Sequence, residues 1–119
     1  MGGLKRIAIL GSTGSIGQQT LEVARVFKDK LSVVALGAGS NTKLLASQIE
    51  EFQPRMVSLQ GSEAELRRSL SPGRGASPRQ VTLEEMACHP DVDLVLIATS
   101  GKAGLAPTLA AIRARKEVA

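Results

Sequence analysis

The sequence predicts an α/β fold, a doubly wound parallel sheet with helices on both of its faces. Three observations support this prediction: short aliphatic runs that stop at glycine, segments of helical periodicity after these runs, and regular alternation between the two. Strands that alternate with helices form parallel βαβ units, whose right-handed crossovers place helices on both faces of an open sheet. The chain of 119 residues, 43% of them apolar, is long enough for one such domain with a single core.

The first strand, the first helix and the second strand are predicted between residues 6 and 36. Residues 6–10 read Arg-Ile-Ala-Ile-Leu and stop at a glycine, a pattern typical of a buried parallel strand. From Ser15 to Phe27, apolar residues recur at helical spacing and polar residues fill the opposite face, which predicts a helix of about three turns. Residues 31–36, Leu-Ser-Val-Val-Ala-Leu, form a second aliphatic run that ends at Gly37.

Two further helices and a third strand are predicted before residue 71. Asn41 or Thr42 is suited to cap a helix that carries apolar residues on one face and ends near Phe52, because a proline follows soon after. The brief run Met-Val-Ser-Leu at 56–59 predicts the third strand. Residues 62–65, Ser-Glu-Ala-Glu, have the spacing of a capping box, so a short helix is expected there.

The rest of the chain continues the same alternation after a loop. Residues 71–79, Ser-Pro-Gly-Arg-Gly-Ala-Ser-Pro-Arg, contain several prolines, glycines and serines, and we interpret them as a surface loop inside one domain. A short capped helix is expected at 82–88, a strand at 92–98 and a helix at 104–115. Residues 117–119 are expected to begin one more strand.

Composition and charge narrow the classes of function. A net charge of +4 and an isoelectric point of about 9.7 indicate an anionic partner, but two Phe and no Tyr or Trp provide no stacking platform for a nucleic acid. The longest apolar run, residues 92–98, is too short to span a membrane, and no export signal is recognisable near Lys5 and Arg6. With one cysteine the chain has no disulfide framework, so a cytoplasmic location is expected.

Cys88 and His89, with Asp91 and Asp93 nearby, look like a cluster of metal ligands. Their spacing fits no common zinc site, and the chain has one Cys and one His in total. A histidine that ends a helix before Pro90 is the ordinary explanation. We therefore expect no metal site at these residues.

A glycine-rich turn between the first strand and the first helix carries the main functional signal. Residues 11–17, Gly-Ser-Thr-Gly-Ser-Ile-Gly, have the spacing GxxGxxG, one residue wider than the usual dinucleotide fingerprint. Gly11 would allow a tight turn, Gly14 the close approach of a pyrophosphate, and Gly17 close packing of helix on strand. The first N–H groups of the helix would then point at phosphates. A flexible turn without a ligand is the alternative, and a Walker-type loop is disfavoured because no Gly-Lys-Ser/Thr is present.

The segment after the second strand bears on the choice between NAD and NADP. An NAD site usually places Asp or Glu there, to accept a hydrogen bond from the ribose. Residues 37–43 read Gly-Ala-Gly-Ser-Asn-Thr-Lys, without a carboxylate to repel a 2′-phosphate, and Ser40, Asn41 and Lys43 can donate to one. NADP in a Rossmann-like fold is therefore favoured. A capping role for Asn41 is compatible with this, because the start of a helix is also an anion site.

Four collinear segments resemble one known family: GSTGSIG at 11–17, VVALGAGSN at 33–41, FQPRMV at 52–57 and SGKAGLAPTLAAIRARKEVA at 100–119. The chain resembles the 1-deoxy-D-xylulose 5-phosphate reductoisomerases. The resemblance implies that residues 1–119 form the NADPH-binding domain, and that the catalytic and C-terminal domains of the family are absent from this chain. It assigns no catalytic residue and no metal ligand here. It implies contacts with the pyrophosphate and adjoining ribose for Thr13, Gly14, Ser15 and Ile16, and with the 2′-phosphate for Gly39, Ser40 and Asn41.

The resemblance also implies an activity for the full enzyme. That enzyme would convert 1-deoxy-D-xylulose 5-phosphate, a sugar phosphate, to 2-C-methyl-D-erythritol 4-phosphate in the non-mevalonate isoprenoid pathway. It would use NADPH and a divalent Mg or Mn ion, and would be a homodimer. Many relatives carry Lys or Arg at the position of Ser40, so this site would rely on neutral donors, with charge from Lys43 or from outside the chain. Ser100 and Gly101 follow the strand at 92–98, at the edge where doubly wound folds bind ligands, and are expected beside the nicotinamide.

Two other functions remain open on the sequence. The NADP-binding domain of a semialdehyde or acyl-phosphate dehydrogenase has a similar glycine turn, but it needs a nucleophilic cysteine in a later segment, and Cys88 is misplaced for that. A non-catalytic module that senses a nucleotide is the second alternative. By the resemblance, this chain alone is not expected to be catalytically competent.

Overall fold

The computed structural model describes residues 4–61, 63–70, 78–99 and 101–119. Within these residues, six parallel strands form one sheet, in the order β4-β3-β2-β1-β5-β6. This arrangement confirms the α/β class and the parallel sheet. In chain order the elements are β1 (Lys5–Leu10), α1 (Ser15–Val26), β2 (Leu31–Ala38), α2 (Thr42–Phe52), β3 (Met56–Leu59), α3 (Glu63–Ser69), β4 (Arg79–Gln80), α4 (Leu83–Cys88), β5 (Leu94–Ile97), a 3₁₀ turn (Gly101–Gly104), α5 (Leu105–Arg113) and β6 (Glu117–Val118).

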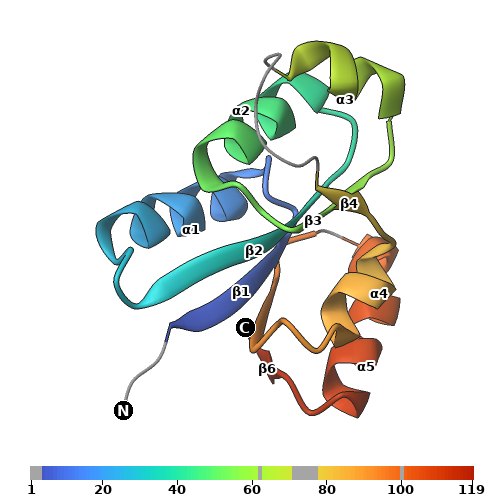
Figure 1. Ribbon diagram of the computed structural model, residues 1–119. Coiled ribbons are helices and arrows are strands. Elements are labelled where there is room, and N and C mark those ends of the chain that lie inside the picture. Colours follow the sequence, from blue (N-terminus) through green and yellow to red (C-terminus); the bar gives the residue numbers. More distant parts are fainter. Residues whose placement is uncertain (1–3, 62, 71–77, 100) are drawn as a thin grey trace.

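Helices cover both faces of the sheet, and β1 supplies side chains to both (Figure 1). Ile9 of β1 belongs to the core that α1, α2 and α3 form with one face. The next residue, Leu10, belongs to the core that α4 and α5 form with the other face. Since successive strand residues point to opposite faces, a strand with two buried faces is aliphatic throughout. This explains the uninterrupted apolar run at residues 7–10, all of which are buried.

The order of the strands reverses direction at β1. From β1 the chain moves to β2 and then to β3 on one side, whereas β5 and β6 lie on the other side of β1. The register pairs Leu10 with Gly37 of β2 and with Ile97 of β5, so the carboxyl ends of these three strands meet. In doubly wound folds this switch point is where ligands bind.

The helix ends follow the predicted capping chemistry where the structure describes them. The Asn41 side chain accepts a hydrogen bond from the N–H of Leu44 at 3.2 Å and caps α2. Thr82 caps α4 in the same way, through the N–H of Glu85 at 3.1 Å. The capping box predicted for α3 begins at residue 62, which lies outside the described residues. None of the helices in the described ranges is long and apolar enough to cross a membrane.

One element was predicted wrongly, and several boundaries differ. Arg79 was expected to end a surface loop, but with Gln80 it forms the edge strand β4, which pairs with Met56 and Val57 of β3. The pattern failed because both β4 residues are exposed, so this strand has no apolar run of its own. The rest of the predicted loop, apart from Pro78, lies outside the described residues. Strand β2 runs two residues longer than expected, β5 covers only Leu94–Ile97 of the predicted 92–98, and α5 is shorter than 104–115.

Candidate functional site

The glycine turn lies at the switch point, where it leaves β1 and enters α1. The N–H groups of Gly11 and Ser12 both donate to the carbonyl oxygen of Gly37, each at 2.8 Å, so the turn is tied to the end of β2. Gly11 has φ +97°, a conformation that side chains rarely adopt. The backbone of the turn is therefore tied to the carboxyl end of β2.

Two of the three glycines are required by packing inside the protein. A Cβ atom on Gly17 would lie 2.1 Å from the carbonyl oxygen of Gly11, and one on Gly11 would lie 2.7 Å from the carbonyl carbon of Ala98. Gly17 thus allows α1 to pack closely on the turn, as predicted. Gly14 differs, because its φ is −82° and a Cβ there would lie 3.6 Å from the same Gly11 oxygen. Packing inside the described protein therefore does not require glycine at position 14.

Each of the first three carbonyl groups of the turn accepts a hydrogen bond from the protein. The oxygen of Gly11 accepts from the N–H of Gly14 at 3.2 Å, and that of Thr13 accepts from the side chain of Gln18 at 2.9 Å. The oxygen of Ser12 accepts from the side chain of Gln48 at 2.8 Å. These bonds occupy the first three carbonyl oxygens of the turn, and the bond to Ser12 is buried.

The N–H groups at the start of α1 remain available to a ligand. Helix α1 begins at Ser15, its N-cap Gly14 has no side chain, and Ser15 and Ile16 are exposed. The first N–H groups of any helix have no acceptor within the helix, and the helix dipole adds positive potential there. The turn therefore presents N–H donors at the start of α1, while its first three carbonyl oxygens are occupied by hydrogen bonds from the protein, an arrangement suited to an anion.

The second predicted segment lies between β2 and α2. Gly39, Ser40 and Asn41 are exposed, and among the described residues no atom lies within 4 Å of a Cβ placed on Gly39. The carbonyl oxygen of Ser40 accepts hydrogen bonds from the backbone and the hydroxyl of Thr42, at 2.9 and 3.3 Å. The oxygen of the Asn41 side-chain amide caps α2, so the NH₂ group of the same amide is left to donate to a phosphate. Lys43, also exposed, follows in the first turn of α2.

A cavity of about 250 Å³ lies between the two segments. It brings together Gly14 and Gly39, whereas the other five predicted contact residues are not among its lining residues. A neighbouring hollow of about 520 Å³ shares Gln60, Leu83 and Ala103 with it. Ser100, expected beside the nicotinamide, lies outside the described residues. The cavity is lined by Gly11, Gly14, Gly37, Ala38, Gly39, Gln60, Leu83, Ala98, Thr99 and Ala103.

Several residues of the site were not predicted from the sequence. Gln60, Leu83 and Ala103 come from separate segments that no local motif connects. Gln48 did carry a signal, because it follows Leu45 at helical spacing and precedes Ile49, both of which are buried on the core face of α2. A glutamine on such a face needs a buried hydrogen-bond partner.

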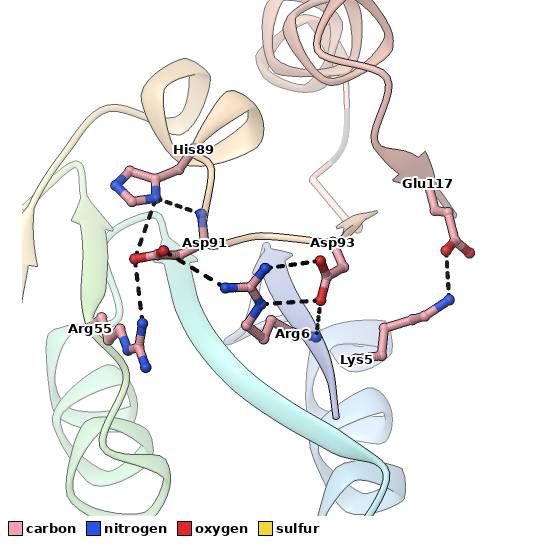
Figure 2. Close-up of polar contacts among 7 residues, drawn as sticks. All are labelled: Lys5, Arg6, Arg55, His89, Asp91, Asp93 and Glu117. Atoms are coloured by element: carbon pink, nitrogen blue, oxygen red, sulfur yellow. Dashed lines mark hydrogen bonds and ion pairs between the residues drawn. The ribbon is translucent and has the colours of Figure 1, made fainter. Parts of the chain in front are cut away.

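Of the residues that looked like metal ligands, Asp91 and Asp93 instead form ion pairs near the amino ends of the strands (Figure 2), whereas the thiol of Cys88 lies 3.6 Å from the carbonyl oxygen of Glu85. The guanidinium of Arg6 donates to both oxygens of Asp93, each at 3.2 Å, and lies 3.7 Å from Asp91. Arg55 contacts Asp91 at 3.4 Å, and His89 accepts a hydrogen bond from the N–H of Asp91 at 3.0 Å. The hydrogen bonds from Arg6 hold the pKa of Asp93 below its ordinary value. No group of three or more acidic, His or Cys residues in the described ranges is arranged to hold a metal ion.

The fold and the turn together define a class, the Rossmann-like domains that carry a dinucleotide-type glycine turn at the switch point of the sheet. Comparison with known proteins then identifies the family. The profile of the family 1-deoxy-D-xylulose 5-phosphate reductoisomerase matches residues 7–119. The chain belongs to the 1-deoxy-D-xylulose 5-phosphate reductoisomerase family, as the resemblance implied.

Relatives and solved structures agree with this assignment. The protein of that name from Heliobacterium modesticaldum is 50% identical over an alignment of 121 positions, which covers 98% of this chain and 31% of the relative. A crystal structure of DOX-P reductoisomerase in complex with magnesium has a TM-score of 0.87 and 34% identity, and covers 97% of this chain and 30% of that one. The enzyme from Zymomonas mobilis in complex with NADPH has a TM-score of 0.85 and 32% identity, with coverage of 98% and 31%. The chain thus spans about a third of the length of these proteins.

Proposed function

We propose that this chain is the NADPH-binding part of a 1-deoxy-D-xylulose 5-phosphate reductoisomerase. The observation that carries the proposal is the glycine turn, whose first three carbonyl oxygens accept hydrogen bonds from the protein while Ser15 and Ile16, at the start of α1, are exposed. The similar structure from Zymomonas mobilis is a complex with NADPH, which supports the choice of cofactor.

The proposed contacts divide the cofactor between two segments. Residues Thr13 to Ile16 bind the pyrophosphate and adjoining ribose through backbone N–H groups and hydroxyls. Gly39, Ser40 and Asn41 bind the 2′-phosphate, with hydroxyl and amide donors and no carboxylate to repel it. A site built from neutral donors binds a phosphate less strongly than one with a bidentate arginine. NADPH is therefore preferred over NADH by a margin that one added cation would increase.

The activity of the whole enzyme is a further proposal, since the chain covers only 31% of the length of its relative. The full protein converts 1-deoxy-D-xylulose 5-phosphate to 2-C-methyl-D-erythritol 4-phosphate in the isoprenoid pathway and acts as a cytoplasmic homodimer. NADPH supplies the hydride, and Mg or Mn polarises the substrate oxygens. Magnesium is present in a similar structure, and we place its ligands in the part of the enzyme that this chain does not match. The observations favour neither the dehydrogenase nor the nucleotide-sensing alternative.

Titration with NADPH and NADH tests the proposal directly. The fluorescence of the reduced nicotinamide reports binding, and the chain has no Trp or Tyr to contribute emission of its own. We expect NADPH to bind more tightly than NADH. Absence of binding of either cofactor to the folded chain would refute cofactor binding, and equal affinity for both would refute the assignment of the 2′-phosphate segment.

The variant Ser40→Arg sharpens the test. A guanidinium at this exposed position can pair with the 2′-phosphate, so we expect NADPH affinity to rise about tenfold and NADH affinity to change by less than about twofold. The control is Ser47→Arg, the same change at an exposed position farther along α2. An equal gain from both variants would indicate general charge attraction rather than a 2′-phosphate site.

A further inference from the structure

The buried side chain of Gln48 joins α2 to the glycine turn. Gln48 is 4% exposed and Ser12 is 0% exposed, and the amide nitrogen of Gln48 donates to the Ser12 carbonyl at 2.8 Å. Among the described residues, neither the carbonyl oxygen of the Gln48 side chain nor the hydroxyl of Ser12 has a hydrogen-bond partner. A buried polar atom without a partner destabilises a fold. An apolar side chain would avoid that cost, so core packing alone does not account for glutamine at this position.

The hydrogen bond from Gln48 is the second one that fixes the backbone of Ser12. Its N–H donates to the Gly37 oxygen at the end of β2, and its carbonyl accepts from Gln48 on α2. The peptide groups that lead into α1 are thereby fixed in direction. The N–H groups of Ser15 and Ile16 follow three and four residues later and take their direction from this part of the turn.

The same helix also begins at the proposed 2′-phosphate segment. Asn41 caps α2, and Gln48 lies seven residues farther along, about 10 Å at the helical rise of 1.5 Å per residue. Helix α2 therefore spans the distance between the two halves of the proposed cofactor site. Its first turn presents donors to one phosphate, and Gln48 in its second turn holds the loop that faces the other.

We propose that Gln48 is a positioning residue, which fixes the phosphate-binding turn against α2 and sets the spacing between the two phosphate contacts before the cofactor binds. This inference rests on the proposed function and deepens it. When a site is already ordered, less of the binding free energy is lost in ordering it. Loss of the Gln48 contact therefore lowers the affinity for ligands that touch the turn. A ligand that touches only the 2′-phosphate segment keeps its affinity.

The test compares two ligands on the variant Gln48→Met, which keeps the length of the side chain and removes the donor. We expect NADPH to bind about tenfold more weakly, and adenosine 2′-monophosphate, which lacks the pyrophosphate, to change by less than about twofold. The control Gln19→Met makes the same change at an exposed position of α1 and should leave both affinities unaltered. General damage to the fold would lower the affinity for both ligands, and that result would overturn the positioning role.

A measurement on the unmutated chain covers the case in which the variant fails to fold. The NMR signals of the Gln48 side-chain NH₂ group should shift when NADPH is added and remain in place with adenosine 2′-monophosphate. Unchanged signals with NADPH, or normal NADPH affinity in Gln48→Met, would overturn the positioning role alone. Failure of the unmutated chain to bind NADPH would instead overturn the proposed function.

Discussion

The glycines at positions 14 and 17 differ in what lies next to them. At Gly17 the neighbour is the backbone of the turn itself, 2.1 Å from where a Cβ would lie, and backbone atoms cannot rotate away as a side chain can. At Gly14 the nearest protein atom leaves room for a methyl group. Packing of the fold therefore requires glycine at position 17 and leaves position 14 free for the proposed contact with the cofactor.

Alanine substitutions at these positions should separate stability from binding. We expect Gly17→Ala to lower the free energy of unfolding by about 2 kcal/mol or more, because α1 must move away from the turn. Gly14→Ala should change it by less than about 0.5 kcal/mol and should still weaken NADPH binding, because the methyl group occupies the space of the pyrophosphate. Urea unfolding and cofactor titration measure the two effects. A large loss of stability in Gly14→Ala would contradict this division.

At the scale of single residues, roles that depend on neighbouring residues in the sequence could be predicted. Roles that depend on a distant part of the chain could not. Gly17 was correctly predicted because the turn and the helix follow each other directly and leave little space there, and Gly11 because the tight turn requires a positive φ. Asn41 was predicted as a cap because its partner lies three residues away. The role of Gln48 depends on a residue 36 positions earlier in the chain, and only its place on an apolar helix face hinted at a buried partner.

Pairing of β1 with β5 is reinforced at the amino ends of the strands by Arg6 and Asp93. Besides the guanidinium contacts, the backbone N–H of Arg6 donates to the Asp93 carboxylate at 2.8 Å. These bonds, which are made to the ionised carboxylate, lower the pKa of Asp93 in the folded protein. The folded chain therefore keeps this charge at an acidity where the unfolded chain has taken up a proton.

The variant Asp93→Asn should show that the lowered pKa of Asp93 makes stability depend on pH. The stabilisation is fully present above the unfolded pKa of about 4, and it is lost as the pH falls through the lower pKa of the folded state. We expect the unmutated chain to be more stable than Asp93→Asn near pH 7 and the difference to disappear under strongly acidic conditions. Urea unfolding over a series of pH values measures this, with the exposed Asp29→Asn as control. A difference that is constant with pH would show that the charge is not responsible.

Elements with an apolar pattern of their own were predictable, and β4 was not. Strands β1 and β2 are buried on both faces, so their composition identifies them without reference to the rest of the chain. Strand β4 consists of two exposed residues, Arg79 and Gln80, which are extended because they pair with β3 at the edge of the sheet. The extended conformation of β4 is determined by its pairing with β3. Because β3 lies more than 20 residues earlier in the chain, the sequence around β4 carries no signal of this pairing.

Across the whole molecule, one strand joins two cores. Ile9 and Leu10 are fully buried neighbours in β1, and they pack against opposite layers of helices. Loss of packing on either face removes contacts of the same strand. The two layers should therefore unfold together, as is usual for a domain of this size.

Truncation of either residue tests this cooperativity. We expect Ile9→Ala and Leu10→Ala each to lower the free energy of unfolding by about 3 kcal/mol, a large part of the 5–15 kcal/mol typical of a domain. Val26→Ala, at an exposed position of α1, should have an effect below about 0.5 kcal/mol. Circular dichroism and one-dimensional NMR should report one shared transition for each variant. Two separate transitions would show that the helical layers are independent.

The cavity at the carboxyl ends of the strands could be predicted at this scale, but its lining residues could not. Parallel βαβ units and a reversal of strand order place ligands at the carboxyl edge in any doubly wound fold. Gln60, Leu83 and Ala103 reach the cavity from the loop after β3, the start of α4 and the 3₁₀ turn, whose positions depend on how the helices pack. No periodicity in the sequence encodes those paths.

The ion pairs of Figure 2 and the glycine turn lie at opposite ends of the strands. Strand β1 has six residues, which separates the two edges by about 20 Å at 3.3 Å per residue. Charges this far apart are screened from one another at physiological ionic strength, where the Debye length is about 8 Å. Adaptation to acid or to salt can therefore act on one edge and leave cofactor recognition at the other unchanged.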